Sequence, residues 1–321
     1  MTKIAVLDDW QGVARDCADW SALETRAEVT FFREAFDSED AAAQSLAPFD
    51  IILSLRERTA FPASLVQRLP NLRMFSLTGA RAGSIDSKLM MERDVTVCVT
   101  ASGGSGYATS ELALGLMIAA SRCLPSAFEQ MQQGRFQSEV PLGYELAGKT
   151  LGIVGLGRLG GRMARYATAM EMDVIAWSEN LTTERAAAAG ARYVSKQELF
   201  EGADVVSVHL VLSARTRGIV AAQDLARMKP GAVIINTSRG PLIDQAALLA
   251  ALQAGKLVAG LDVYDREPLP GDHPLRTLPN VVLTPHLGYV VRETMTAFYT
   301  QLVENALAFM DGKPIRLMPP A

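Results

Sequence analysis

A glycine-rich turn between two apolar segments constrains the fold of this chain more than any other feature. Residues 151–154 (Leu-Gly-Ile-Val) form a short apolar run, followed directly by Gly155-Leu156-Gly157-Arg158-Leu159-Gly160. A helical pattern then covers residues 161–170, and a second apolar run covers residues 174–177. In such a turn the first glycine suits a tight bend, the second lets backbone amides approach a diphosphate, and the third lets a helix pack closely on a sheet. The pattern predicts a β-turn-helix-β unit whose residues Gly155, Gly157, Arg158, Leu159 and Gly160 bind a dinucleotide.

The second strand of this unit ends without the acidic residue that usually binds the ribose of NAD about 20 residues after the glycines. Ser178 occupies that position, and Glu179 follows it. A serine tolerates a 2′-phosphate, whereas Glu179 would repel one, and no basic residue follows until Arg185. Both NAD and NADP therefore stay open as cofactors, with NAD slightly favoured.

Composition and charge favour a folded two-domain protein and argue against nucleic acid or membrane as partners. The 321 residues are 49% hydrophobic and 21% charged, which is enough for two cores. The formal net charge is −4, so a basic surface for nucleic acid or anionic lipid is not expected. Apolar runs are shorter than the roughly 18 to 20 residues of a bilayer span. Residues 1–9 enter a strand pattern without a signal peptide, so we expect a cytoplasmic protein.

The three cysteines, Cys17, Cys98 and Cys123, are far apart and match neither a CxxC nor a Cys/His metal spacing. We expect reduced, mostly buried thiols. No metal site is expected.

Strand and helix patterns alternate along the chain, which predicts an α/β fold with two doubly wound parallel-sheet domains. Five strand-like runs fall within residues 1–100. Two more flank the glycine turn, and four follow it, at residues 204–208, 232–236, 258–262 and 281–284. We predict a dinucleotide-binding domain of six strands over residues 101–287. The helical tail is expected to return to the first domain, which then comprises residues 1–100 and 288–321.

A long apolar helix and an irregular arm lie before the glycine turn. Residues 109–121 are apolar on nearly every face, so this helix is expected to be buried all round, either between domains or in a subunit contact. The arm over residues 122–146 carries Phe128, Met131 and Phe136. Exposed aromatic side chains on such an arm favour contact with a second copy of the chain, and a homodimer is expected.

Two loops of the first domain follow strands, where ligands of parallel sheets gather. Residues 54–59 include Arg56, and residues 78–83 read Thr-Gly-Ala-Arg-Ala-Gly, with Gly79 and Ala80. Arginine and free backbone amides would suit a small anion. The alternative is that both are solvated surface loops.

Three further residues with useful chemistry follow strands of the second domain. Arg239 can bind a carboxylate with two parallel hydrogen bonds. His286 with a carboxylate partner such as Glu267 is a candidate general acid/base. Their positions at strand ends on the edge that carries the glycine turn favour a functional role over surface pairing or a buried structural histidine. His209 also ends a strand and is expected to line the cofactor pocket.

The motifs together resemble the D-isomer-specific 2-hydroxyacid dehydrogenases, which include phosphoglycerate dehydrogenase and glyoxylate/hydroxypyruvate reductase. The likeness covers nearly the whole chain and rests on the glycine turn and three further motifs: Asn236-Thr237-Ser238-Arg239-Gly240, Asp262-Val263-Tyr264 with Glu267-Pro268, and Pro285-His286-Leu287-Gly288. It implies a Rossmann domain inserted into a smaller, flavodoxin-like substrate domain. It also implies an NAD(P)-dependent oxidoreductase, usually a homodimer.

Roles follow from the resemblance at matching positions. Arg239 would bind the substrate carboxylate, His286 would be the acid/base, and Glu267 would hold it. Asp262 matches the acid expected to contact the nicotinamide carboxamide, and Thr237, Ser238 and Gly288 are taken as cofactor-side residues of the same motifs. Gly79 matches the loop whose backbone receives the carboxylate, although Ala80-Arg81 departs from the usual Gly-Val-Asp pattern.

The implied reaction is hydride transfer between NAD(P)H and a small 2-oxo acid, giving a D-2-hydroxy acid. Short polar acids such as glyoxylate or hydroxypyruvate are the expected substrates. The alternative is a protein of the same fold that senses NAD(H) as a corepressor, since such relatives keep the same Arg/Glu/His set.

Overall fold

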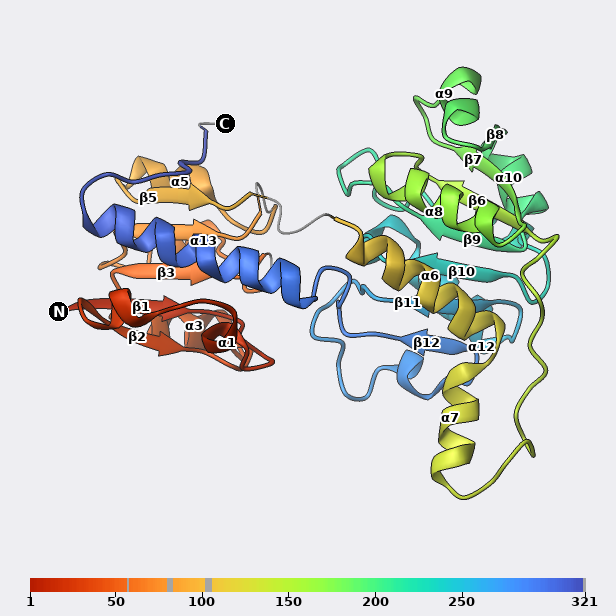
Figure 1. The fold of residues 1–321 in the computed structure, drawn as a ribbon, viewed down its shortest axis with the longest axis horizontal. Coiled ribbons are helices and arrows are strands. Elements are labelled where there is room, and N and C mark those ends of the chain that lie inside the picture. The colour runs from red at the N-terminus through yellow and green to blue at the C-terminus, as the bar shows by residue number, and fades with distance from the viewer. Residues whose placement is uncertain (57, 80–82, 102–105, 320–321) are drawn as a thin grey trace. The chain divides into compact units, whose positions relative to one another are not determined.

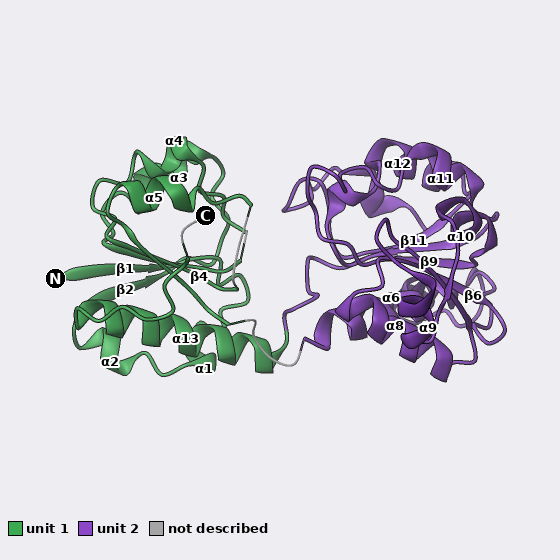
Figure 2. Cartoon of the chain, turned by 90° about the horizontal axis from the view of Figure 1, so that it is seen from above, with its two compact units in different colours: residues 1–105, 291–321 green, residues 106–290 purple. Residues whose placement is uncertain are grey.

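A computed structural model describes residues 1–56, 58–79, 83–101 and 106–319 of the chain. The described chain divides into two compact units (Figure 2). Unit 1 comprises residues 1–105 and 291–321, and unit 2 comprises residues 106–290. The sequence placed the corresponding boundaries after residues 100 and 287.

Unit 1 is a doubly wound α/β domain. Its strands are β1 (Thr2–Val6), β2 (Ala27–Phe31), β3 (Ile51–Ser54), β4 (Met74–Leu77) and β5 (Thr96–Val99). Its helices are α1 (Ala14–Cys17), α2 (Ser21–Glu24), α3 (Glu39–Leu46), α4 (Ala63–Val66), α5 (Ser87–Glu92) and α13 (Arg292–Met310). The strands are all parallel in the order β2-β1-β3-β4-β5, which is the flavodoxin-like order. Helices α3, α4 and α5 cover one face, and α1, α2 and α13 cover the other (Figure 2).

The C-terminal helix α13 belongs to unit 1 and lies along its sheet (Figure 1). The amide of Asn305, fully buried, donates to Ser76 Oγ (3.0 Å) and to the Val99 carbonyl (3.1 Å). Tyr299 is also fully buried, with its hydroxyl 3.4 Å from Asp9 Oδ1. These contacts tie the end of the chain to strands formed near its beginning.

Unit 2 is built on a larger parallel sheet. Its strands are β6 (Thr150–Val154), β7 (Asp173–Trp177), β8 (Arg192–Tyr193), β9 (Val205–Val208), β10 (Val233–Asn236), β11 (Val258–Leu261) and β12 (Val281–Leu283). Its helices are α6 (Ala108–Ser121), α7 (Leu124–Gln132), α8 (Arg158–Ala169), α9 (Thr183–Ala188), α10 (Lys196–Gly202), α11 (Ala222–Arg227) and α12 (Gln245–Gln253), with 3₁₀ turns η1 (Gly240–Leu242) and η2 (Pro274–Thr277). The strand order is β12-β11-β10-β9-β6-β7-β8.

This order is that of a Rossmann domain, with the direction of winding reversed between β6 and β9. The sequence predicted six strands, and the described sheet has seven, because the two-residue strand β8 pairs with β7. So short a strand leaves no recognisable apolar alternation. The predicted fold class, two doubly wound parallel sheets, is confirmed.

Several helices begin or end at residues of the type that favours helix caps. Ser38 accepts from the amide of Ala41 (3.2 Å) at the start of α3, and Asp244 accepts from the amide of Ala247 (3.0 Å) at the start of α12. Gly255, just after α12, has φ 66°, as a helix-ending glycine should.

Helix α6 was predicted to be buried all round, between domains or in a subunit contact, and burial in such a contact stays a prediction. Ala113, Leu116 and Met117 are buried in the core of unit 2, where α6 packs on β10 and β11. Other apolar residues of the helix are only half-buried, and Glu111 is exposed. The helix thus has one fully packed face.

Within the described ranges, no single helix is long and apolar enough to cross a membrane, and only the pair α6 and α7, bent by 69°, reaches that length together.

Candidate active site

The three predicted catalytic residues follow three neighbouring strands of unit 2. Arg239 follows β10, Glu267 follows β11 and His286 follows β12, and these strands are adjacent and parallel. Because the carboxyl ends of parallel strands meet at one edge of the sheet, the three residues come to the same edge as the glycine turn after β6.

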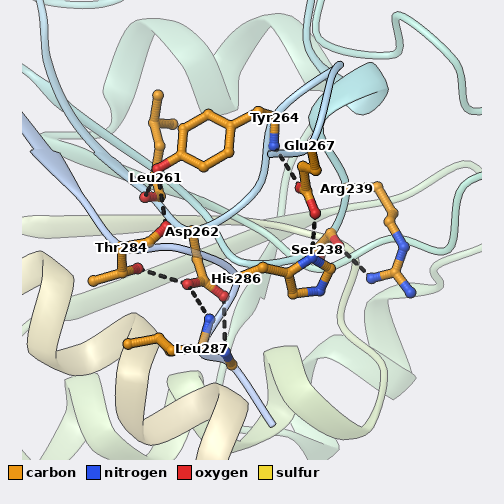
Figure 3. Close-up of polar contacts among 10 residues, drawn as sticks. Ser238, Arg239, Leu261, Asp262, Tyr264, Glu267, Thr284, His286 and Leu287 are labelled. Atoms are coloured by element: carbon orange, nitrogen blue, oxygen red, sulfur yellow. Dashed lines mark hydrogen bonds and ion pairs between the residues drawn. The ribbon is translucent and has the colours of Figure 1, made fainter. Parts of the chain in front are cut away.

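Glu267 and His286 form a direct hydrogen-bonded pair (Figure 3). Oε2 of Glu267 lies 2.5 Å from Nδ1 of His286. The other carboxylate oxygen accepts from the amide of Tyr264 at 2.9 Å, which fixes the acid in place. With Nδ1 donating to the carboxylate, Nε2 is the nitrogen left for a substrate. The His286 side chain is 14% exposed and the Glu267 side chain is 29% exposed. The pair is therefore partly desolvated but still accessible to a small molecule.

Arg239 lies in the same close-up as this pair (Figure 3). Its Nη1 donates to the Ser238 carbonyl (2.5 Å), and its own carbonyl accepts from Asn236 Nδ2 (2.9 Å). The next residue, Gly240, packs so closely on the Tyr264–Asp265 backbone that a Cβ there would lie 2.2 Å from the Tyr264 carbonyl carbon. The backbone that carries Arg239 therefore abuts the segment that leads to Glu267.

Asp262, at the end of β11, is fully buried and bonds to the turn that carries His286. Oδ1 accepts from Thr284 Oγ1 (2.6 Å) and the Leu287 amide (2.7 Å), and Oδ2 accepts from the Gly288 amide (2.8 Å). Burial raises the pKa of Asp262 above its ordinary value, and these hydrogen bonds together with His286 oppose the rise. The carboxylate of Asp262 thus holds the turn that carries His286.

The glycine turn has the geometry that a dinucleotide diphosphate needs. Gly155 has φ 98°, and a Cβ there would lie 2.7 Å from the His209 carbonyl oxygen. A Cβ on Gly160 would lie 2.2 Å from the Gly155 carbonyl oxygen, so only glycine lets α8 pack this closely. Around Gly157, by contrast, the space is open to 4 Å. The free amides at the start of α8 follow directly, as in anion sites at helix N-termini.

Two buried polar atoms beside this turn lack a partner among the described residues, His209 Nδ1 and Thr237 Oγ1. They follow paired residues of the neighbouring strands β9 and β10. Unsatisfied buried polar groups are costly, and their presence at the switch point of the sheet fits a polar ligand there. The site therefore fits the nicotinamide dinucleotide.

His209 is a neutral group in this site. Its Nε2 lies 2.8 Å from the hydroxyl of the fully buried Ser207, and burial lowers the pKa of His209 to about 4. Ser238, also predicted on the cofactor side, is buried and donates its hydroxyl to the Val208 carbonyl at 2.8 Å. Its side chain thus joins β10 to β9.

The remaining predicted cofactor residues lie around the same edge. Arg158 begins α8 and is exposed, while Leu159 is half-buried. Ser178, which follows β7, is half-buried and Glu179 is exposed. Gly288 is buried, and a Cβ there would lie 3.1 Å from Asp262 Oδ2.

The residues predicted to bind substrate in unit 1 lie at the carboxyl edge of its sheet. The amide of Arg56 donates to Thr78 Oγ1 (2.8 Å), and that of Gly79 donates to Thr100 Oγ1 (2.9 Å). A Cβ on Gly79 would lie 2.3 Å from Nη1 of Arg56, so the guanidinium rests on the glycine. Ala80 lies outside the described residues.

Sequence reasoning missed several residues that shape these edges. Thr109 Oγ1 donates to the Gly288 carbonyl, and Thr284 Oγ1 donates to the carboxylate of Asp262. In unit 1, Asp8 is buried, accepts from Thr59 Oγ1 (2.9 Å), and has its pKa raised to about 6 by burial. An acid directly after the apolar run of residues 4–7 was the available signal for Asp8.

Comparison with known proteins identifies the class of protein that this fold and site define. The family model described as "D-isomer specific 2-hydroxyacid dehydrogenase, NAD binding domain" matches residues 114–288. The chain belongs to the D-isomer-specific 2-hydroxyacid dehydrogenase family.

Individual relatives carry related names. The D-3-phosphoglycerate dehydrogenase of Archaeoglobus fulgidus is 35% identical over 98% of this chain, which spans only 58% of that relative's length. The glyoxylate reductase of Korarchaeum cryptofilum is 33% identical, with 91% of this chain and 90% of the relative covered. Among solved structures, phosphoglycerate oxidoreductase from Vibrio cholerae superposes with a TM-score of 0.91 at 39% identity, covering 97% of this chain and all of that one.

Proposed function

We propose that this chain reduces a small 2-oxo acid to a D-2-hydroxy acid with NADH or NADPH and catalyses the reverse reaction. The observation that carries the proposal is the 2.5 Å pair of His286 and Glu267 at the strand edge shared with Arg239 and the glycine turn. A histidine held by a carboxylate at the edge where dinucleotides bind can donate the proton that reduction of a carbonyl group needs.

The chain's own side chains then supply binding and proton transfer. Arg239 binds the carboxylate of the oxo acid and polarises the adjacent carbonyl, because its planar fork matches two carboxylate oxygens. His286 donates the proton at Nε2 to the carbonyl oxygen, and Glu267 stabilises the charged imidazolium before that transfer. A bound reduced nicotinamide supplies the hydride to the carbonyl carbon. In the reverse direction His286 takes up the hydroxyl proton at the same atom.

Short polar acids, glyoxylate or hydroxypyruvate, are the proposed substrates, and the named activity of the Korarchaeum cryptofilum relative supports this choice. NAD is the proposed cofactor. Its support is that Glu179 follows Ser178 at the end of β7, and that Arg185 is exposed and donates to the Asn180 carbonyl (3.1 Å).

The deciding experiment follows the absorbance of NADH and of NADPH with a panel of short 2-oxo acids. Oxidation of a reduced cofactor that depends on one of these acids, and yields the D-hydroxy acid, supports the proposal. Tight cofactor binding without turnover of any acid would reject it in favour of the NAD(H)-sensing corepressor.

We also propose that the protein is a homodimer formed through the arm that includes α7. Four large apolar side chains of the arm are exposed: Phe128 by 64%, Met131 by 58%, Phe136 by 71% and Leu142 by 99%. Large exposed apolar groups on one segment mark contact surfaces. Light scattering should give twice the chain mass, and the monomer mass would contradict the proposal.

A further inference from the structure

The turn that carries His286 depends on support from other elements. The turn follows β12 and covers residues 284–288, and it places His286 at φ 55°, in the left-handed region that residues other than glycine rarely adopt. Such a backbone persists only where surrounding groups hold it. The groups that hold this turn therefore decide where the imidazole lies.

Asp262 bonds to the turn on both sides of His286. Its carboxylate accepts from Thr284 on the N-terminal side and from the amides of Leu287 and Gly288 on the C-terminal side (Figure 3). Its main-chain carbonyl accepts from the amide of His286 itself at 2.9 Å. A single buried residue at the end of β11 thus binds every residue of the turn except the proline.

A second element holds the end of the turn. Thr109 of α6 donates its hydroxyl to the carbonyl of Gly288 at 2.7 Å, while the amide of Gly288 donates to Asp262. Gly288 is therefore held through both of its backbone groups. Any side chain at that position would crowd Asp262 Oδ2, at 3.1 Å, and Thr109 Cγ2, at 3.3 Å.

We propose that Asp262 is a positioning residue, which acts on the reaction by holding the turn so that His286 stays against Glu267. The proposal rests on the proposed function for its kinetic consequence. The family resemblance implies another role for Asp262, contact with the nicotinamide carboxamide. The two roles differ in outcome: loss of positioning lowers turnover, whereas loss of a cofactor contact lowers cofactor affinity.

Asp262→Asn is the sharpest substitution because it keeps the volume of the side chain. The amide oxygen can still accept from Thr284 and Leu287, but the NH2 group cannot accept from the amide of Gly288. The new NH2 group and the backbone amide of Gly288, both donors, then face each other at the end of the turn. The variant loosens the turn without opening a cavity.

For Asp262→Asn we expect turnover at saturating cofactor to fall about 100-fold, the effect of misplacing a reacting group by about 1 Å. The dissociation constant of NADH, measured by its fluorescence, should stay within about threefold. In the double variant with His286→Ala, the second substitution should add no further loss, because both act through one imidazole. Unchanged turnover with cofactor affinity weakened more than about tenfold, or additive losses in the double variant, would overturn the proposal.

Thr284 offers a matched pair should Asp262→Asn fold poorly. Thr284→Val removes one donor to Asp262 at nearly constant volume, and Thr284→Ser keeps it. We expect Thr284→Val to lower turnover and Thr284→Ser to recover most of the loss. Equal turnover in the two variants would contradict a positioning role.

Amide hydrogen exchange at Leu287 and Gly288 reports on the turn without any catalysis. Both amides should exchange faster in Asp262→Asn than in the unaltered protein, and equal exchange would count against the role of Asp262. If the unaltered protein reduces no 2-oxo acid, the proposed function fails, while the exchange rates still decide whether Asp262 holds the turn.

Discussion

Glu267 and His286 are nineteen positions apart in the sequence, yet Oε2 of the acid lies 2.5 Å from Nδ1 of the imidazole. They meet because β11 and β12 are neighbours in a parallel sheet, so the loops that follow them start from the same edge. The acid selects the ring nitrogen that carries the bonded proton and leaves the other nitrogen for substrate.

The first prediction concerns this pair. His286→Ala should lower turnover by roughly 10² to 10⁴, the usual contribution of general acid/base catalysis, with little change in NADH affinity. Glu267→Gln keeps an acceptor but loses the charge, and roughly a 10- to 100-fold loss is expected, as for other groups that orient a functional histidine. Steady-state kinetics with the best acid of the panel provide the measurement. A fully active His286→Ala enzyme would remove the histidine from the mechanism.

The second prediction concerns Arg239. Arg239→Lys should lower kcat/KM for the oxo acid by about 100-fold, or nearly 3 kcal/mol, because a point charge cannot replace two parallel hydrogen bonds. NADH affinity should not change. Arg227→Lys, at an exposed position in α11, is the matched control. Equal losses in the two variants would show that the effect is not specific to the site.

The third prediction concerns cofactor choice at Ser178. Ser178→Asp places a carboxylate where the 2′-phosphate of NADPH would lie, so the preference for NADH over NADPH should rise about tenfold. Ser178→Ala adds no charge and serves as the control. The ratio of kcat/KM for the two cofactors measures the effect, and an unchanged ratio would place Ser178 away from the ribose.

The fourth prediction concerns three glycines and distinguishes a role in leaving space for the cofactor from a role in close packing. A Cβ at Gly157 meets no atom within 4 Å, so Gly157→Ala should keep the melting temperature but weaken NADH binding by about tenfold or more. At Gly160 a Cβ would strike the Gly155 carbonyl oxygen, so Gly160→Ala should destabilise unit 2 by about 1–3 kcal/mol. Gly161→Ala, also in open space within α8, is the control and should be neutral or slightly stabilising. Normal NADH affinity in Gly157→Ala would place the diphosphate elsewhere.

The fifth prediction concerns pH and Asp8. Its pKa is about 6 in the folded protein against an ordinary value of 3.8, so the folded state binds the proton more tightly. The associated stability is present below about pH 4 and is lost as the pH rises to about 6, for a total of about 3 kcal/mol. Arg58 and the hydrogen bonds from Thr59 oppose the shift without cancelling it.

The side chain introduced by Asp8→Asn cannot ionise, so the variant should not lose this stability as the pH rises. Relative to the unaltered protein, the variant should become more stable by about 3 kcal/mol between about pH 4 and pH 7. Urea unfolding followed by tryptophan fluorescence, to which Trp10 and Trp20 of unit 1 contribute, measures the difference. A difference that does not vary with pH would show that Asp8 keeps its ordinary pKa.

The sequence predicted the two sheets and the location of the three catalytic candidates because both depend on local patterns. Short apolar runs give parallel strands, and parallel strands bring the residues after them to one edge. The glycine turn was also predictable from local sequence, because each of its glycines meets a requirement of the turn or of the helix that follows it. That explains why Arg239, Glu267 and His286 can be grouped from the sequence alone.

Contacts that depend on the path of a loop were not predictable in this way. The resemblance implies a cofactor contact for Asp262, which stays a prediction, but the sequence did not indicate the hydrogen bonds that its carboxylate accepts from Thr284, Leu287 and Gly288. Thr109 reaches the same turn across 179 positions of sequence. Neither pairing leaves a periodic or compositional trace, because each requires the folded backbone to be known first.

The attachment of α13 to unit 1 has a consequence for synthesis of the protein. Ser76 and Val99 leave the ribosome long before Asn305, whose side-chain amide donates a hydrogen bond to each of them. Unit 2, being continuous, can complete its core while unit 1 still waits for its final helix. On the ribosome the middle of the chain should mature first, and the part of the N-terminal sheet that α13 covers should stay exposed until that helix has been made.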